Sequence, residues 1–403
     1  MKQVTGGVCA AIGFKANGVL CGIRKNRSKK DLALIVSDKR ASAACVYTQN
    51  LVRGAPIEVT RANVADGYAS AIFVNSGNAN TCNANGIEIA EQMCALVERE
   101  LGIPAADVVV ASTGVIGQTL SITPIESGIG ALAAGLGDNS GLAVEAIMTT
   151  DTTVKEIAFE FELGGVKCHM GGIAKGSGMI HPNMATMLGF ITTDAAITPE
   201  MLQKALSEDT KYTYNMVSVD GDTSTNDMAS VLANGMAGNA EIAAAGADYD
   251  TFCEVLRAVN LYLSRAIAAD GEGATKLLEC VVNGAKSYED ARDIAKAVIC
   301  SPLVKTAMFG EDANWGRILC ALGYAGAQVD VDKVEVTFKS AAGEVQVCES
   351  GRGVDFSEEI AKKVLGEAEL TIAIELGDGT ATATAWGCDL TYDYVKINGD
   401  YRT

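Results

Sequence analysis

A glycine-rich stretch at residues 171–190 constrains the fold more than any other part of the chain. It contains five glycines and one proline, with Lys175 inside the glycine cluster and an apolar run that begins at Met184. Glycine allows positive φ and a close approach of other groups, so a loop that leads into a buried strand is predicted here. The hydroxyl of Thr186 would lie where the loop becomes the strand. On pattern alone, Thr186 is either an ordinary strand residue or a reactive hydroxyl.

The composition indicates a well-buried globular protein of two or three packed units. The chain has 403 residues, of which 48% are hydrophobic and 20% charged, and its net charge is −18. This charge argues against nucleic acid or an anionic membrane as a partner, because phosphate groups are bound by clustered Lys and Arg. No stretch approaches the roughly 20 apolar residues of a membrane span. Because residues 1–7 also lack the apolar core of a secretory signal, we expect a cytoplasmic protein.

The cysteines and histidines narrow the chemistry. The twelve cysteines are scattered singly with no C-x-x-C pair, so we expect free thiols and no metal site. The only histidines are His169 and His181, which rules out a His-x-x-His metal site. A base other than imidazole is therefore expected.

Hydrophobic periodicity predicts a mixture of hairpins and helices. Apolar residues alternate over 157–163, and Gly164-Gly165 would close a hairpin there. A long helix is predicted over about 250–268, and two further hairpins over 334–347 and 370–385. This mixture indicates an α+β layered fold.

Three other patterns are candidate functional signals. A buried strand ends at Thr113-Gly114, where a hydroxyl and an amide could bind an oxyanion, or where a strand could simply end. The asparagine-rich loop 75–86 is either a long connection or the lining of a site. A phosphate loop is excluded because Ser177 stands where lysine is required.

A hydroxyl nucleophile without histidine is known in one form, an N-terminal threonine whose own α-amino group is the base. The unperturbed pKa of that amine, about 7.7–8.0, suits proton transfer at neutral pH. Because Thr186 is internal, this chemistry requires the chain to be cut before it.

Six motifs together resemble the glutamate N-acetyltransferases (ornithine acetyltransferases) of arginine biosynthesis, from about Gly13 to Thr403. They are NSGNAN at 75–80, STGVIG at 112–117, KGSGMIHPNMATML at 175–188, DGDTSTND at 220–227, NWGR at 314–317 and INGDYRT at 397–403. The resemblance implies a layered αββα sandwich with mixed sheets and a catalytic strategy like that of N-terminal-nucleophile hydrolases. It also implies self-cleavage between Ala185 and Thr186, giving an α chain of 1–185 and a β chain of 186–403.

The resemblance further assigns residues to roles. Thr113 and Gly114 match the oxyanion-hole pair, and the catalytic nucleophile is Thr186. The positions that match substrate contacts are Thr149, Lys175, Thr186, Glu272, Asn398 and Thr403, with Thr150 as the alternative to its neighbour. The implied substrates are N-acetylornithine and glutamate, without metal or cofactor, with acetyl-CoA as a candidate co-substrate and an α2β2 assembly.

The physical chemistry of two lone charges fits these substrates. An α-amino acid needs a cation for its carboxylate and an anion for an ammonium, and Lys175 and Glu272 could supply them. Both could equally be surface charges on glycine loops. Two other functions remain open on the sequence, a self-cleaving β-aminopeptidase with a serine nucleophile and a non-catalytic glycine-rich binding protein.

Overall fold

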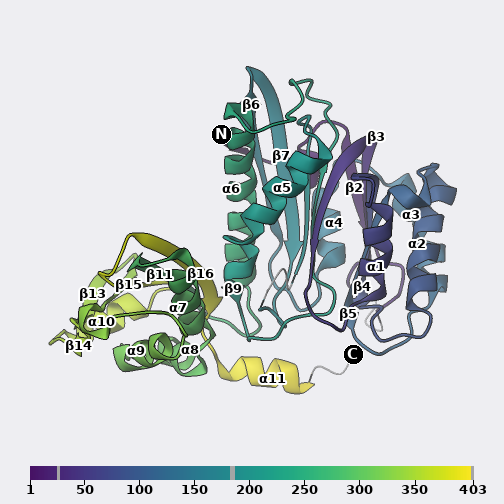
Figure 1. Cartoon of the computed structure of the whole chain (residues 1–403). Coiled ribbons are helices and arrows are strands. Elements are labelled where there is room, and N and C mark those ends of the chain that lie inside the picture. The colour runs from purple at the N-terminus through teal and green to yellow at the C-terminus, as the bar shows by residue number, and fades with distance from the viewer. Residues whose placement is uncertain (25–27, 182–186, 401–403) are drawn as a thin grey trace.

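The larger of two sheets carries most of the first two thirds of the chain. The computed structural model describes residues 1–24, 28–181 and 187–400 (Figure 1). The larger sheet has the strand order β1-β6-β7-β8-β10-β3-β4-β5, with β2 paired to β3. Its strands are β1 (Lys2–Val4), β2 (Phe14–Val19), β3 (Leu32–Tyr47), β4 (Tyr68–Asn78), β5 (Val108–Val115), β6 (Lys155–Leu163), β7 (Val166–Lys175), β8 (Leu188–Thr193) and β10 (Met228–Ala233).

The long strand β3 belongs to both halves of this sheet. Its first part pairs with β2 and β4 and its second part with β10, and its register with β4 shifts between Val36 and Ala41. Side chains of both halves meet in one core, with Ile35 and Ile72 from one half and Phe190 from the other. The two halves therefore pack face to face.

Helices cover the two outer faces, which confirms the predicted αββα layering. The helices α2 and α3 pack on β3, β4 and β5, and α5 and α6 pack on the β6–β10 half. Helix α4 adds its side chains to the core between the halves. The helical segments of this region are α1 (Ala55–Asn63), α2 (Gly86–Leu101), α3 (Ile122–Ala134), α4 (Ser140–Ile147), α5 (Pro199–Thr210), α6 (Ala247–Ala269), η1 (Gly7–Cys9), η2 (Ala105–Asp107) and η3 (Tyr214–Met216).

Local capping explains where several of these helices begin. Helix α5 has Pro199 in its first turn, and the side chain of Thr198 accepts a hydrogen bond from the amide of Met201. Such an N-cap satisfies an amide that has no partner within the helix. The long helix predicted over about 250–268 is α6, three residues longer at its start and one at its end.

The smaller sheet is built almost entirely from the last third of the chain. Its strand order is β14-β13-β12-β15-β11-β16-β9. Its elements are β9 (Val217–Ser218), β11 (Leu277–Ala285), β12 (Glu335–Ser340), β13 (Gly343–Glu349), β14 (Arg352–Gly353), β15 (Glu369–Glu375), β16 (Ala381–Cys388), α7 (Tyr288–Cys300), α8 (Pro302–Phe309), α9 (Trp315–Gly323), α10 (Glu358–Leu365) and η4 (Val331–Lys333).

Two predicted hairpins are confirmed and one is wrong. The β6–β7 hairpin turns at Gly164-Gly165, and β12 pairs with β13 as predicted. The predicted hairpin over 370–385 does not form, because β11 lies between β15 and β16, parallel to the first and antiparallel to the second. Strand β11 has apolar residues on both faces, as is typical of a strand in the middle of a sheet that is covered on both sides.

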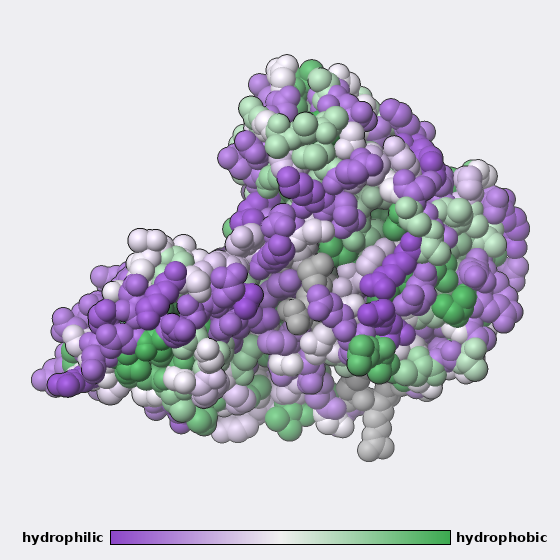
Figure 2. Space-filling model, viewed as in Figure 1, coloured by the Kyte–Doolittle hydropathy of each residue, from purple (hydrophilic) through white to green (hydrophobic). Residues whose placement is uncertain are grey.

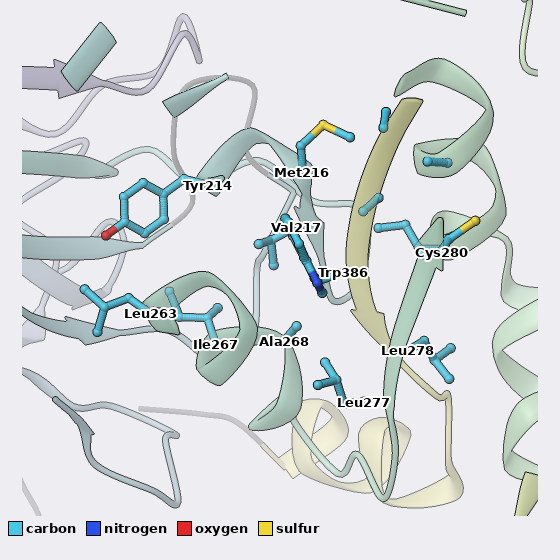
Figure 3. Close-up of a cluster of buried hydrophobic side chains, with 14 of the residues drawn as sticks. Tyr214, Met216, Val217, Leu263, Ile267, Ala268, Leu277, Leu278, Cys280 and Trp386 are labelled. Atoms are coloured by element: carbon cyan, nitrogen blue, oxygen red, sulfur yellow. The ribbon is translucent and has the colours of Figure 1, made fainter. Parts of the chain in front are cut away.

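One apolar core runs from the outer layer of the larger sheet into the smaller sheet. Figure 3 shows Leu263 and Ile267 of α6 near Val217 of β9, with Leu277 of β11 and Trp386 of β16 beyond them. Strand β9 follows η3 of the larger unit but pairs with β16. The two sheets are thus joined by packing and by hydrogen bonds.

The predicted cleavage point lies within the connection between two neighbouring strands. Strand β7 ends at Lys175 and its neighbour β8 begins at Leu188. Strands β8 and β10, which follow residue 186, lie between β7 and β3, which precede it. The predicted α and β chains would therefore share one sheet.

The C-terminal helix α11 (Tyr392–Asp400) has no buried residues and runs below the larger sheet in Figure 1.

The face seen in Figure 2 is mostly hydrophilic, and its outline has a notch between the unit of the larger sheet and the unit of the smaller sheet. No helix among the described residues is long and apolar enough to cross a membrane.

Candidate functional site

A cavity of about 150 Å³ lies where β5, β7 and β8 meet loops from the rest of the chain. This volume is below the roughly 300–1,000 Å³ of sites for drug-sized ligands and suits a molecule of amino-acid size. The residues that line it are Thr113, Gly114, Thr149, Thr150, Lys175, Gly178, Met179, Met187, Leu188, Ser224, Asn226, Asp227, Glu272 and Asn398. Six of them are predicted site residues. The other predicted positions, Ala185, Thr186 and Thr403, lie outside the described residues.

The predicted oxyanion pair lies at the end of β5. Gly114 has φ of 130°, and a Cβ atom there would lie 2.4 Å from the carbonyl carbon of Gly77. Glycine is therefore required here, because it lets β5 lie close against the backbone of β4 at Gly77. The side-chain amide of Asn226 donates to the carbonyl oxygens of Ser112 (3.1 Å) and Ala79 (2.6 Å), which ties the strand end to the neighbouring loop.

The asparagine-rich loop 75–86 supports the site without lining the cavity. Its asparagine side chains bond to the loop's own backbone, as Asn75 does to Asn78 and Asn80 to Gly86. None of the loop's residues lines the cavity among the residues described. Of the two interpretations, the structure favours a connection with a supporting role.

Three buried residues with charged side-chain types, Asp151, Lys155 and Asp270, form what we call the buried charge cluster. The ammonium of Lys155 lies 2.8 Å from Oδ1 of Asp151 and 2.5 Å from Oδ2 of Asp270. Lys155 is 0% exposed and the two aspartates 2% and 7%. Because Lys155 and Lys175 favour the carboxylate form, and the Gly176 amide also donates to it, the pKa of Asp151 lies below its ordinary range despite burial.

The buried charge cluster fixes the segments that carry the cavity residues. Asp151 accepts hydrogen bonds from the amides of Thr149 (2.9 Å) and Gly176 (2.6 Å). Asp270 accepts from the amides of Thr152 and Thr153, at 3.0 Å and 3.2 Å. The three segments around residues 149, 176 and 270 are therefore held in one arrangement.

Glu272 is positioned by the same cluster. The hydroxyl of Ser177 donates to the carbonyl oxygen of Asp270 (2.6 Å), and the amide of Glu272 donates to the carbonyl oxygen of Ser177 (2.9 Å). Asn398 of α11 donates to Oε2 of Glu272 at 2.7 Å. A Cβ atom on Gly178 would lie 2.3 Å from the Glu272 carboxyl carbon, so glycine is required for this approach.

Lys175 is buried without an ion-pair partner among the described residues. It ends β7, is 8% exposed and lines the cavity. Burial lowers the pKa of its ammonium, and the charges of Asp151 and Asp227 oppose that effect. A buried cation without a partner favours an anionic ligand in the cavity.

Asp227 is a cavity residue to which the sequence analysis assigned no role. It is 2% exposed, and its Oδ2 has no hydrogen-bond partner in the described part of the chain. Burial raises the pKa of its carboxyl well above the ordinary value, although a hydrogen bond from Ser224, the charge of Lys175, and hydrogen bonds from Thr48 and the Met187 amide pull the pKa down. The sequence signal was its place in the motif 220–227.

Neither histidine lines the cavity. His169 Nδ1 lies 2.9 Å from Oδ2 of Asp194 at the other end of β7. His181 contacts the hydroxyl of Ser218, and burial lowers its pKa to about 4. The described residues contain no group of three or more His, Cys, Asp or Glu that could hold a metal ion, and their twelve cysteines are free thiols.

Comparisons with known proteins place the chain in one family. The sequence model of the ArgJ family matches residues 15–403. The arginine biosynthesis bifunctional protein ArgJ of Caldanaerobacter subterraneus is 52% identical over 405 residues, and that of Thermotoga neapolitana is 48% identical over 396. The alignments cover 100% of both chains in the first case, and 97% of this chain and 99% of the relative in the second.

A solved structure agrees with these sequences. The crystal structure of the arginine biosynthesis bifunctional protein ArgJ from Bacillus halodurans is 44% identical, with a TM-score of 0.50. The match covers 52% of this chain and 97% of the solved chain. By the family model and the curated relatives, the chain belongs to the ArgJ family.

Proposed function

We propose that this protein is an acetyltransferase of arginine biosynthesis that moves the acetyl group from N2-acetyl-L-ornithine to L-glutamate. The observation that carries the proposal is the cavity, which brings the predicted Thr113, Gly114, Lys175 and Glu272 together beside Met187. The residue before Met187 is the predicted nucleophile, Thr186. Family membership supports this reaction over the peptide hydrolysis considered from the sequence.

The reaction is a ping-pong acyl transfer. The hydroxyl of Thr186 attacks the acetyl carbonyl and gives its proton to the α-amino group of the same residue. That group passes the proton to the ornithine nitrogen as the C–N bond breaks. Thr113 and the amide of Gly114 stabilise the oxyanion. Glutamate then enters, its amine attacks the acetyl ester, and the threonine hydroxyl is restored.

The two cavity charges bind the amino-acid ends of the substrates. The buried ammonium of Lys175 pairs with a carboxylate, and the carboxylate of Glu272, held by Asn398, accepts an ammonium. Thr149, whose amide bonds to Asp151, or its neighbour Thr150, and Thr403 complete the predicted contacts. Such charge-assisted hydrogen bonds give orientation as well as affinity.

Self-cleavage between Ala185 and Thr186 is the step that creates the α-amino group. The Bacillus halodurans comparison supports it, because nearly all of that solved chain matches about half of this one. Residues 186–403 likewise make up just over half of this chain. We propose that the products, an α chain of 1–185 and a β chain of 186–403, assemble as α2β2 in the cytoplasm.

We also propose acetyl-CoA as a second acetyl donor, without a cofactor or metal. The curated relatives are called bifunctional, which supports two activities on one site. In this reaction the acetyl-CoA thioester acylates Thr186 and glutamate again takes the acetyl group. Acetylated Thr186 would be common to both.

Mass spectrometry of the purified protein tests the proposal. Two chains cut between Ala185 and Thr186 are expected, together with a gain of one acetyl group on the β chain after mixing with N-acetylornithine. The T186A variant should remain one uncut chain without transferase activity. A T186A variant cut at the same bond, or a wild type that is never acetylated, would contradict the mechanism.

A second variant tests the oxyanion pair. Loss of one oxyanion donor in T113A should lower kcat by roughly 10²–10³-fold. An effect on KM alone would remove Thr113 from that role.

A further inference from the structure

The predicted oxyanion pair and the predicted nucleophile come from different strands of the larger sheet. Thr113 and Gly114 lie at the end of β5, whereas Met187, which follows Thr186, directly precedes β8. Strands β10, β3 and β4 separate β8 from β5 in the order of the sheet. A displacement of about 1 Å between reacting groups can cost 10²-fold in rate. A contact that links the end of β5 to the start of β8 would therefore matter for catalysis.

Pairing with β4 does not by itself fix the end of β5. The register of the two strands is regular as far as Gly77 and Gly114 and then becomes irregular, with Asn78 opposite both Thr113 and Val115. The position of the oxyanion pair therefore depends also on contacts from outside the two strands.

The side chain of Asn226 makes such a contact from the segment before β10. Its Nδ2 donates to the carbonyl oxygen of Ser112 at 3.1 Å and to that of Ala79 at 2.6 Å. Because a peptide bond is planar, a fixed Ser112 carbonyl also fixes the direction of the amide that follows it, which belongs to Thr113. Asn226 thus orients the peptide plane that leads into the oxyanion pair.

The hydrogen-bonding capacity of the Asn226 side chain is filled within the protein. Its Oδ1 accepts from the hydroxyls of Thr81 (2.5 Å) and Thr225 (2.6 Å), in addition to the two bonds that Nδ2 donates. A carboxamide has two N–H donors and two acceptor lone pairs, so these four bonds use all of them. The side chain is 7% exposed although it lines the cavity. Its four bonds hold backbone and hydroxyl groups in place instead of a substrate.

The backbone after Asn226 joins this contact to the nucleophile. Strand β10 begins two residues later at Met228, whose amide donates to the carbonyl oxygen of Met187 at 3.0 Å. Met187 follows Thr186 directly. A short path therefore runs from Ser112 through Asn226 and Met228 to the neighbour of the nucleophile.

We propose that Asn226 is a positioning residue that holds the oxyanion pair in place relative to Thr186, an inference that rests on the proposed acetyl transfer. Ser112 belongs to the proposed α chain and Asn226 to the proposed β chain, so the contact spans the two products of cleavage. The contact acts when the oxyanion forms and not when the substrate binds. Loss of Asn226 should therefore lower the maximal rate of acetylation and leave the half-saturating donor concentration unchanged.

The test is a double-mutant cycle between Asn226 and Thr113. N226A should slow the maximal rate of β-chain acetylation by N-acetylornithine by roughly 10²-fold, and T113A by roughly 10²–10³-fold. If Asn226 acts through the oxyanion pair, N226A should slow T113A by less than about tenfold, because residues that act as a unit are not additive. Mass spectrometry of the acetylated β chain over time, at a series of donor concentrations, measures the maximal rate and the half-saturating concentration.

Each outcome is decisive. The same factor of loss in the wild-type and T113A backgrounds would show that Asn226 acts independently of the oxyanion pair, which overturns the inference. An unchanged rate, or a change in the half-saturating concentration alone, would overturn it as well. A wild-type protein that N-acetylornithine does not acetylate would instead overturn the proposed function itself.

A second measurement needs no processed enzyme. In T186A, which should stay uncut, the rate of amide hydrogen exchange over residues 108–117 reports how firmly the end of β5 is held. This exchange should be faster in T186A/N226A. It should also be faster in T186A/N226D, because aspartate keeps the size of the side chain and its acceptor oxygen but cannot donate to Ser112. Unchanged exchange in both variants would overturn the inference.

Asn239 provides a matched control. It is also 7% exposed, and it accepts from the amide of Ala196 (2.7 Å) and donates to the carbonyl oxygen of Ala240 (2.8 Å), away from the residues that line the cavity. N239A should change the acetylation rate by the same factor in the wild-type and T113A backgrounds. A smaller factor in T113A would mean that the coupling comes from losing any buried asparagine and not from the contact with Ser112.

Discussion

Two groups of buried charges lie side by side in this protein and differ in how they are paired. In the buried charge cluster, Lys155 lies between Asp151 and Asp270 within 2.8 Å of both. In the cavity, Lys175 has no ion-pair partner in the described part of the chain, and Oδ2 of Asp227 has no hydrogen-bond partner there. The two groups are joined through Gly176, whose amide bonds to Asp151 and which follows Lys175.

The buried charge cluster therefore stabilises the fold, whereas the cavity charges are available to bind a ligand. Burial of a charge is tolerated when the partner is part of the fold, as for Lys155. An incompletely paired charge in a cavity wall lowers stability until a ligand arrives, so its energy is available for binding or catalysis. Substitutions in the two groups should therefore affect different measurements.

The largest effect is expected for K155M. Removing the cation leaves two buried carboxylates without compensation, so the free energy of unfolding should fall by about 3–5 kcal/mol, measured by urea denaturation. Lys305 is a buried control, because it is 3% exposed and its ammonium bonds to the carbonyl oxygen of Cys388. K305M leaves no carboxylate stranded and should lose less. Equal losses in both variants would mean that the cluster has no special role.

The next effect is expected for K175M and E272Q, and in binding instead of folding. Loss of one partner of a desolvated charge contact should cost on the order of 2–5 kcal/mol of substrate binding. Steady-state kinetics with N-acetylornithine and with glutamate would measure this loss, beside unfolding free energies that change little. Values of kcat/KM within a few-fold of wild type for both variants would exclude the two charges from substrate binding.

Stability should respond to pH in opposite directions at two aspartates. The raised pKa of Asp227 means that its contribution is lost as pH rises above the ordinary value of 3.8, whereas the lowered pKa of Asp151 gives stability above that value, lost in acid. Relative to wild type, D227N should therefore gain stability as the pH rises from 4 to 7.5, by about 1.4 kcal/mol for each unit of pKa shift, whereas D151N should lose stability relative to wild type as the pH rises from about 2 to about 4. Urea denaturation across these two pH ranges measures both. Parallel slopes would contradict the distinction.

The smallest effect is expected at an exposed ion pair. Lys15 and Asp38 are 2.7 Å apart, with about half of each side chain exposed. K15M should change the free energy of unfolding by less than about 1 kcal/mol, because solvent screens the pair. A larger change would mean that removing any charge destabilises the protein, and that the loss expected for K155M does not depend on burial.

Local patterns were sufficient for much of the fold but not for its long-range pairing. The α+β layering, the turn at Gly164-Gly165 and helix α6 follow from alternation, turn residues and helical spacing. The error over 370–385 arose because β11 comes from far earlier in the chain. Nothing within 370–385 indicates that another strand is inserted there.

The cavity shows the same limit. The resemblance to a family placed six residues that the structure brings together, although their roles stay predictions. The buried charge cluster was missed because its members are up to 119 residues apart. One signal was present, since Lys155 has the same parity as the buried Ile157 and Phe161 in the alternating strand β6.

The position of β8 and β10 between β7 and β3 has a consequence for the order of folding and the proposed cleavage. Neither 1–185 nor 186–403 contains a complete larger sheet, and each alone would present unpaired strand edges that invite aggregation. If the chain is cut between Ala185 and Thr186, as proposed, the larger sheet must form before the cut. The uncut chain would then be a precursor whose activation requires the folded state, and a misfolded copy would stay inactive.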